Sequence, residues 1–148
     1  MFAEVLQKAF FQTGNSTGMD QTEKFLRKVN MAFQEGDSEF LLNSVTDDFC
    51  WNIVGQKLVG GKSEFSEAIE QMHATPTMKI QVKNVIINNK DAIVEGIVIA
   101  RNRKDQKKYF SFCDVFTLTN TSEPKIRKMR SYVIDVSKHK QYRENPDY

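Results

Sequence analysis

The sequence predicts a single α+β domain in which N-terminal helices pack on a strongly curved, mostly antiparallel sheet. Two observations lead to this prediction. Apolar residues recur at helical spacing through the first half of the chain, and period-two apolar runs separated by turn residues fill the second half. Helices followed by a series of antiparallel strands are typical of the α+β class. A chain of 148 residues also suits one domain with a sizeable core.

Composition and charge argue against several classes of protein. Hydrophobic residues make up 40% of the chain and charged residues 27%, as in an ordinary globular protein. The net charge of +2 is too small to indicate a nucleic-acid partner. No apolar run approaches the roughly 20 residues that a membrane span needs. Cys50 and Cys113 lie in apolar strand-like runs, so we expect buried thiols in a reducing, cytoplasmic setting.

Residues 1–18 are expected to form an extra helix followed by a Gly/Ser/Thr/Asn linker. The apolar stripe of this helix consists of Phe2, Val5, Leu6, Ala9 and Phe10. Its polar face is not basic, and polar residues interrupt the apolar run that a signal peptide would need. We therefore expect the helix to dock on the domain or on a partner protein rather than on a membrane.

The domain itself is expected to span residues 19–137 and to open with two helices. Asp20 and Glu23 form a capping-box pattern that predicts the start of the first helix, and Gly36 predicts its end. The apolar stripe between them consists of Phe25, Leu26, Val29, Ala32 and Phe33. A shorter helix is expected over residues 38–45, with an inward face of Phe40, Leu41, Leu42 and Val45.

The only tryptophan lies in a short strand-like run over residues 49–54. Glycines at 55, 60 and 61 interrupt this run. Ser63 then predicts the N-cap of a third helix, which carries Phe65, Ile69 and Met72. Four strands are expected to follow, over residues 78–88, 92–101, 107–120 and 125–136, the middle two forming a long hairpin. The polar tail over residues 138–148 is expected to lie outside the domain.

Asp114 is the most informative residue of the predicted sheet. Period-two alternation places it on one strand face with Phe110, Phe112, Phe116 and Leu118. An ionised carboxylate is costly in such surroundings, so we expect its pKa to rise, as in many functional sites. The alternative is a structural role, in which Asp114 accepts a hydrogen bond or pairs with Arg130.

Glu95 repeats the pattern on the neighbouring strand, where it shares a face with isoleucines. If paired residues of the hairpin have numbers that sum to 209, Glu95 stands opposite Asp114, and the two carboxyl groups could share a proton. The alternative is a register or a strand edge that exposes Glu95 to water.

The chain from about Thr22 to Val136 resembles the NTF2-like superfamily, which includes SnoaL-like and ketosteroid-isomerase-like domains. The resemblance rests on the order and spacing of "AFQEGDSEFLLNSVTDDFCW", "GGKSEFSEAI", "VEGIV", "YFSFCDVFTL" and "KIRKMRSYVID". It implies a cone-shaped barrel with a cavity at its wide end. It also implies frequent homodimers through the outer sheet face. Trp51 would lie near the cavity, with the Gly55–Gly61 loop on its rim.

The resemblance does not carry over a complete catalytic site. Asp114 matches the neutral acid that hydrogen-bonds the enolate oxygen in ketosteroid isomerases. The position of their general base falls at Asn52 or Ile53, and that of their tyrosine falls near Val29. None of these side chains abstracts a proton, so a steroid-isomerase mechanism is not expected.

We therefore expect a cavity that binds a small hydrophobic molecule, with Asp114 as its main polar contact. The other candidate site residues are Glu95, Trp51, Asn52, Phe112, Arg130 and Tyr132. One alternative is an isomerase, cyclase or dehydratase with Asp114 as the acid and Glu95 as the base. Another is a noncatalytic protein-interaction module. The histidines and cysteines lack the spacing of a metal site, and we expect no cofactor.

Overall fold

The computed structural model describes residues 17–74 and 77–145, so nearly all of the expected extra helix and linker over residues 1–18 lies outside the described residues. The helices are α2 (Thr17–Glu35), α3 (Ser38–Asn43), α4 (Gly61–His73) and α5 (Lys140–Glu144). The strands are β1 (Val45–Ile53), β2 (Lys57–Gly60), β3 (Thr77–Asn88), β4 (Asp91–Arg101), β5 (Lys107–Leu118) and β6 (Ile126–Asp135). The predicted α+β class is confirmed.

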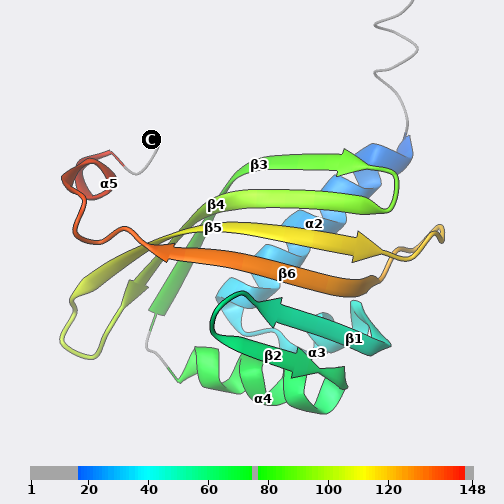
Figure 1. Ribbon diagram of the computed structural model, residues 1–148, viewed down its shortest axis with the longest axis horizontal. Coiled ribbons are helices and arrows are strands. Elements are labelled where there is room, and N and C mark those ends of the chain that lie inside the picture. Colours follow the sequence, from blue (N-terminus) through cyan, green and yellow to red (C-terminus); the bar gives the residue numbers. More distant parts are fainter. Residues whose placement is uncertain (1–16, 75–76, 146–148) are drawn as a thin grey trace, which may run out of the picture.

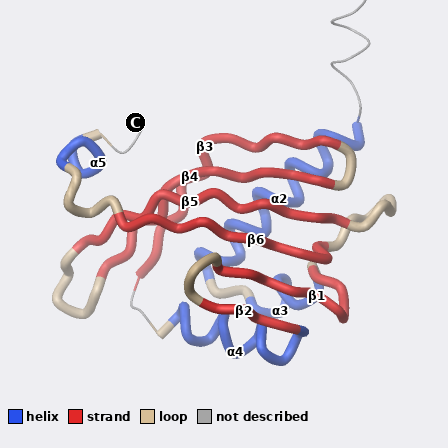
Figure 2. Tube along the Cα trace, viewed as in Figure 1, coloured by secondary structure: helices blue, strands red, loops and turns tan. Residues whose placement is uncertain are grey.

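The six strands form one curved sheet in the order β2-β1-β6-β5-β4-β3. Every neighbouring pair is antiparallel except β1 and β6, which run parallel. Helix α2 crosses one side of the sheet, and α4 lies along β1 and β2 (Figures 1 and 2). We call the side that faces α2 the inner face and the opposite side the outer face.

The hydrophobic core lies between the inner face and the helices. Its largest fully buried side chains from the sheet include Phe49 and Phe116, and Leu26 and Val29 come from α2. Phe65 of α4 packs its ring against Phe49, with ring centroids 4.8 Å apart. Alternation of apolar and polar residues along the strands thus directs one set of side chains inward, as the sequence pattern predicts.

Two predicted helix starts are wrong. Helix α2 begins at Thr17, so Asp20 lies within the helix rather than at its N-cap, and Glu23 instead forms an ion pair of 2.9 Å with Arg27 one turn later. Helix α4 begins two residues before Ser63. Its N-cap is Gly60, whose backbone N–H donates to Glu64 Oε2 at 2.7 Å. Glu64 therefore accepts from the N–H of the N-cap residue, as the glutamate of a capping box does, and Ser63 is not the cap.

The segments around the glycines and the tail also differ from the predictions. Helix α3 ends at Asn43, and Val45 opens β1 instead of closing the helix. The glycine-rich break holds a short strand, β2, which pairs with β1 across a turn where Gly55 has a φ of +78°. Positive φ is a conformation that glycine adopts without strain. The tail contains the short helix α5.

A β-bulge in β6 shifts the alternation of that strand. Leu118 pairs with Ile126 and Thr117 with Lys128, so Arg127 is an extra residue between them. As a result, Ile126 and Met129 are both buried although they are three residues apart. All inward residues of β6 after the bulge therefore have odd numbers.

Candidate functional site

A cavity of about 90 Å³ lies on the inner face, between the sheet and helices α2 and α4. Its lining consists of Asn30, Phe33, Trp51, Met72, Met78, Ile80, Val98, Phe112, Asp114, Met129, Ser131 and Val133. Asp114 is the one ionisable side chain among these described residues. Two larger hollows, of about 790 and 440 Å³, are lined mostly by exposed polar side chains and hold no buried ionisable group. The small cavity is therefore the candidate site.

Asp114 lies in the middle of β5 and is 7% exposed. Its neighbours along the inner face of β5 are Phe112 and Phe116, and its partner on β4 is Val94. Burial raises the pKa of the Asp114 carboxyl to about 7, and the side chain of Ser131 offsets only part of that rise. Among the described residues, no charged group contributes to this shift. Near neutral pH the side chain is therefore divided between its acid and its carboxylate.

Ser131 and Trp51 lie in the cavity wall together with this carboxyl group. Ser131 of β6 stands directly opposite Asp114 and is 2% exposed. Its hydroxyl oxygen accepts a hydrogen bond of 2.8 Å from the indole Nε1 of Trp51. The Trp51 ring also lies against Phe33, with centroids 5.6 Å apart. The only tryptophan is thus part of the cavity wall and satisfies its N–H inside it.

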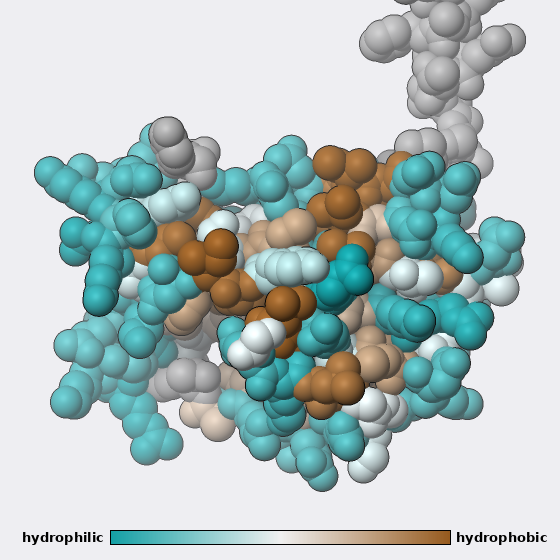
Figure 3. Space-filling view, in the orientation of Figure 1, coloured by the Kyte–Doolittle hydropathy of each residue, from teal (hydrophilic) through white to brown (hydrophobic). Residues whose placement is uncertain are grey.

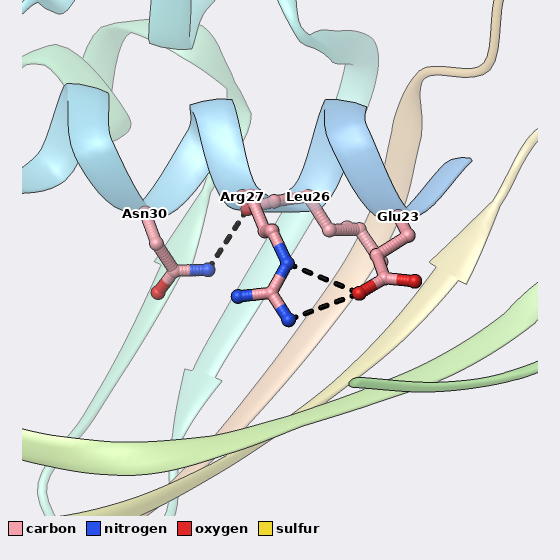
Figure 4. Close-up of polar contacts among 4 residues, drawn as sticks. All are labelled: Glu23, Leu26, Arg27 and Asn30. Carbon is pink, nitrogen blue, oxygen red and sulfur yellow. Dashed lines mark hydrogen bonds and ion pairs between the residues drawn. The ribbon is translucent and has the colours of Figure 1, made fainter. Parts of the chain in front are cut away.

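Helix α2 contributes a second buried polar group. The Asn30 side chain is 5% exposed, and its Nδ2 donates to the carbonyl oxygen of Leu26 at 2.9 Å. Figure 4 shows this amide turned back along its own helix, while Arg27 turns to Glu23. Because the amide nitrogen is used by the helix, the Asn30 oxygen is the atom that could contact a ligand.

The predicted register between Glu95 and Asp114 is wrong by one residue. Asp114 pairs with Val94, and Glu95 pairs with Cys113, so paired numbers sum to 208 instead of 209. A shift of one residue turns a side chain to the opposite face. Glu95 accordingly lies exposed on the outer face, where its Oε1 accepts from Asn84 Nδ2 at 2.7 Å. It cannot share a proton with Asp114 or act as a base in the cavity.

Three other predicted contacts also lie on the outer face. Asn52 alternates with the inward Trp51 and is therefore exposed on the outer face. It pairs with Leu58 of β2 and Arg130 of β6. Arg130 lies over the ring of Tyr132, which is 44% exposed. We expected Arg130 and Tyr132 on the inner face because they alternate with the apolar Ile126. The bulge at Arg127 reverses that alternation. Arg130 therefore makes no pair with Asp114.

The cysteines are free thiols and are half buried rather than buried. Burial raises the pKa of the Cys113 thiol, and the nearby Asp114 and Glu95 add to that effect. Within residues 17–74 and 77–145, no three His, Cys, Asp or Glu side chains gather as a metal site would require. In the same residues, no helix is long and apolar enough to cross a membrane.

Sequence reasoning missed Ser131 and Asn30. A serine within a strand and an asparagine within a helix have no distinctive spacing. The charged residues around each of them are more numerous and gave the more obvious pattern. Ser131 does alternate with Met129 and Val133, two apolar residues of the same strand. This alternation, considered without Ile126, would have placed Ser131 on the inner face.

Comparison with known proteins agrees with this geometry. Residues 25–127 match the family model of the SnoaL-like domain. No curated protein matches the chain. An NTF2-like protein from Cytophaga hutchinsonii is 23% identical, with 76% of this chain and 98% of that one covered and a TM-score of 0.60. A ketosteroid isomerase-like protein from Erwinia carotovora is 19% identical, with 81% of this chain and 98% of that one covered and a TM-score of 0.63.

A further similar structure is that of SalBIII, an epoxide hydrolase/cyclase-like enzyme in pyran ring formation in polyether salinomycin. It is 18% identical, with 78% of this chain and 92% of that one covered and a TM-score of 0.69. At such identities the likeness shows the fold and no more. The family model, in contrast, spans residues 25–127 of a 148-residue chain. The chain therefore belongs to the SnoaL-like domain family and has an NTF2-like fold.

Proposed function

We propose that the inner cavity binds a small, mostly apolar molecule that accepts a hydrogen bond from protonated Asp114. The observation that carries this proposal is a single buried carboxyl group in an otherwise uncharged wall. A neutral carboxylic acid is a hydrogen-bond donor, and a carbonyl or ether oxygen is its natural acceptor. The aromatic rings of Phe33, Trp51 and Phe112 supply apolar contact around it.

The size of the cavity limits what enters it. A volume of about 90 Å³ is smaller than the roughly 150 Å³ cavity that holds benzene in another protein. Met72 and Met78 form part of the wall, and methionine side chains adapt easily to a new shape. We therefore propose that the oxygen-bearing end of the ligand enters first and that the two methionines move to admit the rest.

Cyclopentanone and cyclohexanone are suitable probes, with cyclopentane as the partner that lacks an acceptor. Binding is measured from the methyl NMR signals of Met72 and Met78 at pH 6. Replacing Asp114 with valine should weaken binding of the ketones up to about tenfold, the worth of one hydrogen bond. Glu95→Gln is the matched control and should leave binding unchanged. Methyl signals that do not respond to millimolar ketone would refute the proposal.

A second candidate function follows from the same single acid. An epoxide or carbonyl that reacts with a hydroxyl group of its own molecule needs an acid, and no protein base other than the carboxylate that this acid becomes. Asp114 would protonate the epoxide oxygen as its C–O bond breaks, while the substrate hydroxyl forms the new C–O bond and gives its proton to the resulting carboxylate. Glu95 cannot serve as the base of the expected isomerase, because its side chain lies on the outer face. Turnover of an epoxy-alcohol by the wild type but not by Asp114→Asn is the test.

We also propose that two copies of the chain pair through the outer face. Exposed apolar side chains cluster there on several strands, among them Ile86 at 60%, Tyr132 at 44% and Ile134 at 64% exposure. Figure 3 shows hydrophobic residues interspersed with hydrophilic ones across this face. Glu95 and Arg130 give it both signs of charge, which supports a second copy as the partner, since opposite charges can meet across a twofold axis.

Light scattering coupled to gel filtration tests the pairing. Ile134→Lys should shift the mass from two chains to one. Met31→Lys changes an apolar residue of similar exposure, 51%, on helix α2 and should leave the mass unchanged. A wild-type mass of one chain at micromolar concentration would contradict the proposal.

A further inference from the structure

The end of helix α2 is bonded both to the end of α4 and to the start of β3. All three elements contribute to the cavity wall, and the lining residues that they supply there include Phe33, Met72, Met78 and Ile80. Two side-chain hydrogen bonds join the elements, and each one ends on the backbone of a lining residue, Phe33 or Ile80. The position of this part of the wall therefore depends on two side chains that do not themselves line the cavity.

The first bond comes from His73, the last residue of α4. Its Nε2 lies 2.8 Å from the carbonyl oxygen of Phe33. A carbonyl oxygen can only accept, so Nε2 carries the hydrogen and His73 is the donor. The ring also lies against Gly36, where a Cβ atom would come within 2.9 Å of it. The imidazole is thus held from two sides, directly after Met72 in the chain.

The second bond comes from Gln34, which follows Phe33 in α2. Its Oε1 accepts the backbone N–H of Ile80 at 2.8 Å. Strand β3 is the last of the six in the sheet, so its free side has no neighbouring strand among the described residues to accept such an N–H. The Gln34 side chain supplies the acceptor instead. It ties to α2 the stretch of β3 whose Met78 and Ile80 line the cavity.

We propose that Gln34 and His73 are positioning residues that hold the wall formed by Met72 and Met78 and so set the size of ligand that enters. This inference rests on the proposed binding function. A larger ketone needs this wall displaced further than a smaller one does. Its apparent affinity is lowered by the small fraction of molecules in which the wall is displaced, and breaking either bond raises that fraction. One hydrogen bond is worth up to about tenfold in such an equilibrium.

The test compares cyclooctanone with cyclopentanone, two cyclic ketones that differ only in the number of ring carbons. Their affinities are measured from the methyl NMR signals of Met72 and Met78 at pH 6. In Gln34→Leu and in His73→Leu, the affinity for cyclooctanone relative to cyclopentanone should rise by up to about tenfold. Gln34→Glu keeps the acceptor and His73→Gln keeps a donor, so both should retain the wild-type ratio. Gln71→Leu, an exposed position beside Met72, is the matched control and should also retain it.

A second measurement uses no ligand and so separates this inference from the proposed function. Relaxation dispersion of the same methyl groups reports motion of the wall on the microsecond to millisecond timescale. It should increase in Gln34→Leu and His73→Leu and stay at the wild-type level in Gln71→Leu. If no ketone binds to any variant, the proposed function fails, and the relaxation data alone decide the positioning role. Unchanged methyl relaxation, or an unchanged ratio of affinities where the ketones bind, overturns the proposal in whichever leucine variant at 34 or 73 folds.

Discussion

Asp114 and Glu95 are carboxyl groups on neighbouring strands, and their surroundings could hardly differ more. Asp114 faces inward, is 7% exposed and meets only uncharged side chains, so burial raises its pKa to about 7. Glu95 is one residue out of register with it, faces outward and accepts a hydrogen bond from Asn84 in contact with water. One step along a strand therefore separates a titrating group from a surface charge.

The same contrast extends to the apolar residues of the two faces. Phe116 on the inner face is 0% exposed, whereas Ile86 on the outer face is 60% exposed. We therefore expect inner residues to determine the stability of one chain, whereas the proposed pairing of two copies involves outer residues. The following changes test that division.

The largest expected effect is a core truncation. Phe116→Ala should lower the free energy of unfolding by about 3–5 kcal/mol, because it removes buried ring surface and leaves a cavity. Ile86→Ala, the outer-face control, should change it by less than about 1 kcal/mol. Urea denaturation of both variants measures the difference. Equal effects would mean that the outer face is covered in the isolated chain.

The next effect concerns pH. Between about pH 3.8 and 7 only the folded chain holds the Asp114 proton, so the free energy of unfolding falls as the pH rises through this range. The displacement of the pKa from 3.8 to about 7 corresponds to about 4 kcal/mol. Asp114→Asn has no charge to bury and should lack this decline. At pH 8 it should match or exceed the wild type in stability.

Denaturation at pH 4.5, 6 and 8 checks this prediction, with Glu95→Gln as the matched control. The difference between wild type and Asp114→Asn should change with pH, while the difference between wild type and Glu95→Gln should stay flat. If Asp114→Asn loses stability equally at all three values, Asp114 is a structural hydrogen-bond acceptor.

The smallest of the three effects concerns the close approach of β4 to β3 at Gly96. A Cβ atom at Gly96 would lie 2.1 Å from the backbone oxygen of Gln81, next to the register shift in β3. Gly96→Ala should therefore cost about 1–3 kcal/mol through overpacking. At Gly60 the nearest atom is the flexible Glu64 carboxylate, 3.8 Å away, so Gly60→Ala should cost less. Thermal unfolding compares the stability of the two variants. Equal losses of stability would show that β3 shifts to make room for the added methyl group.

The fold was predictable because its main signals are local. Helical stripes and strand alternation lie within single elements, and the inward set on β5, including Phe112 and Asp114, follows from alternation alone. The strand register is different, because it depends on how two elements pair. Nothing within β4 distinguishes a register in which the numbers of paired residues sum to 208 from one in which they sum to 209. The face on which Glu95 lies could therefore not be derived.

The site was only partly predictable for the same reason. The bulge at Arg127 is created by pairing between β5 and β6, and it moved Arg130 and Tyr132 to the outer face. Ser131 matters because Trp51, 80 residues earlier, lies beside it. Such a relation is a property of the folded sheet and has no counterpart in the spacing of the sequence.

The parallel pairing of β1 with β6 has a consequence for how the chain is made. Strand β1 is synthesised well before its partner β6, which occupies residues 126–135. Until β6 is made, β1 and β5 both present an open edge that can pair with other chains. Contacts over such separations also form slowly. The wall of the cavity is therefore completed last, and a chain that stops before β6 is exposed to aggregation.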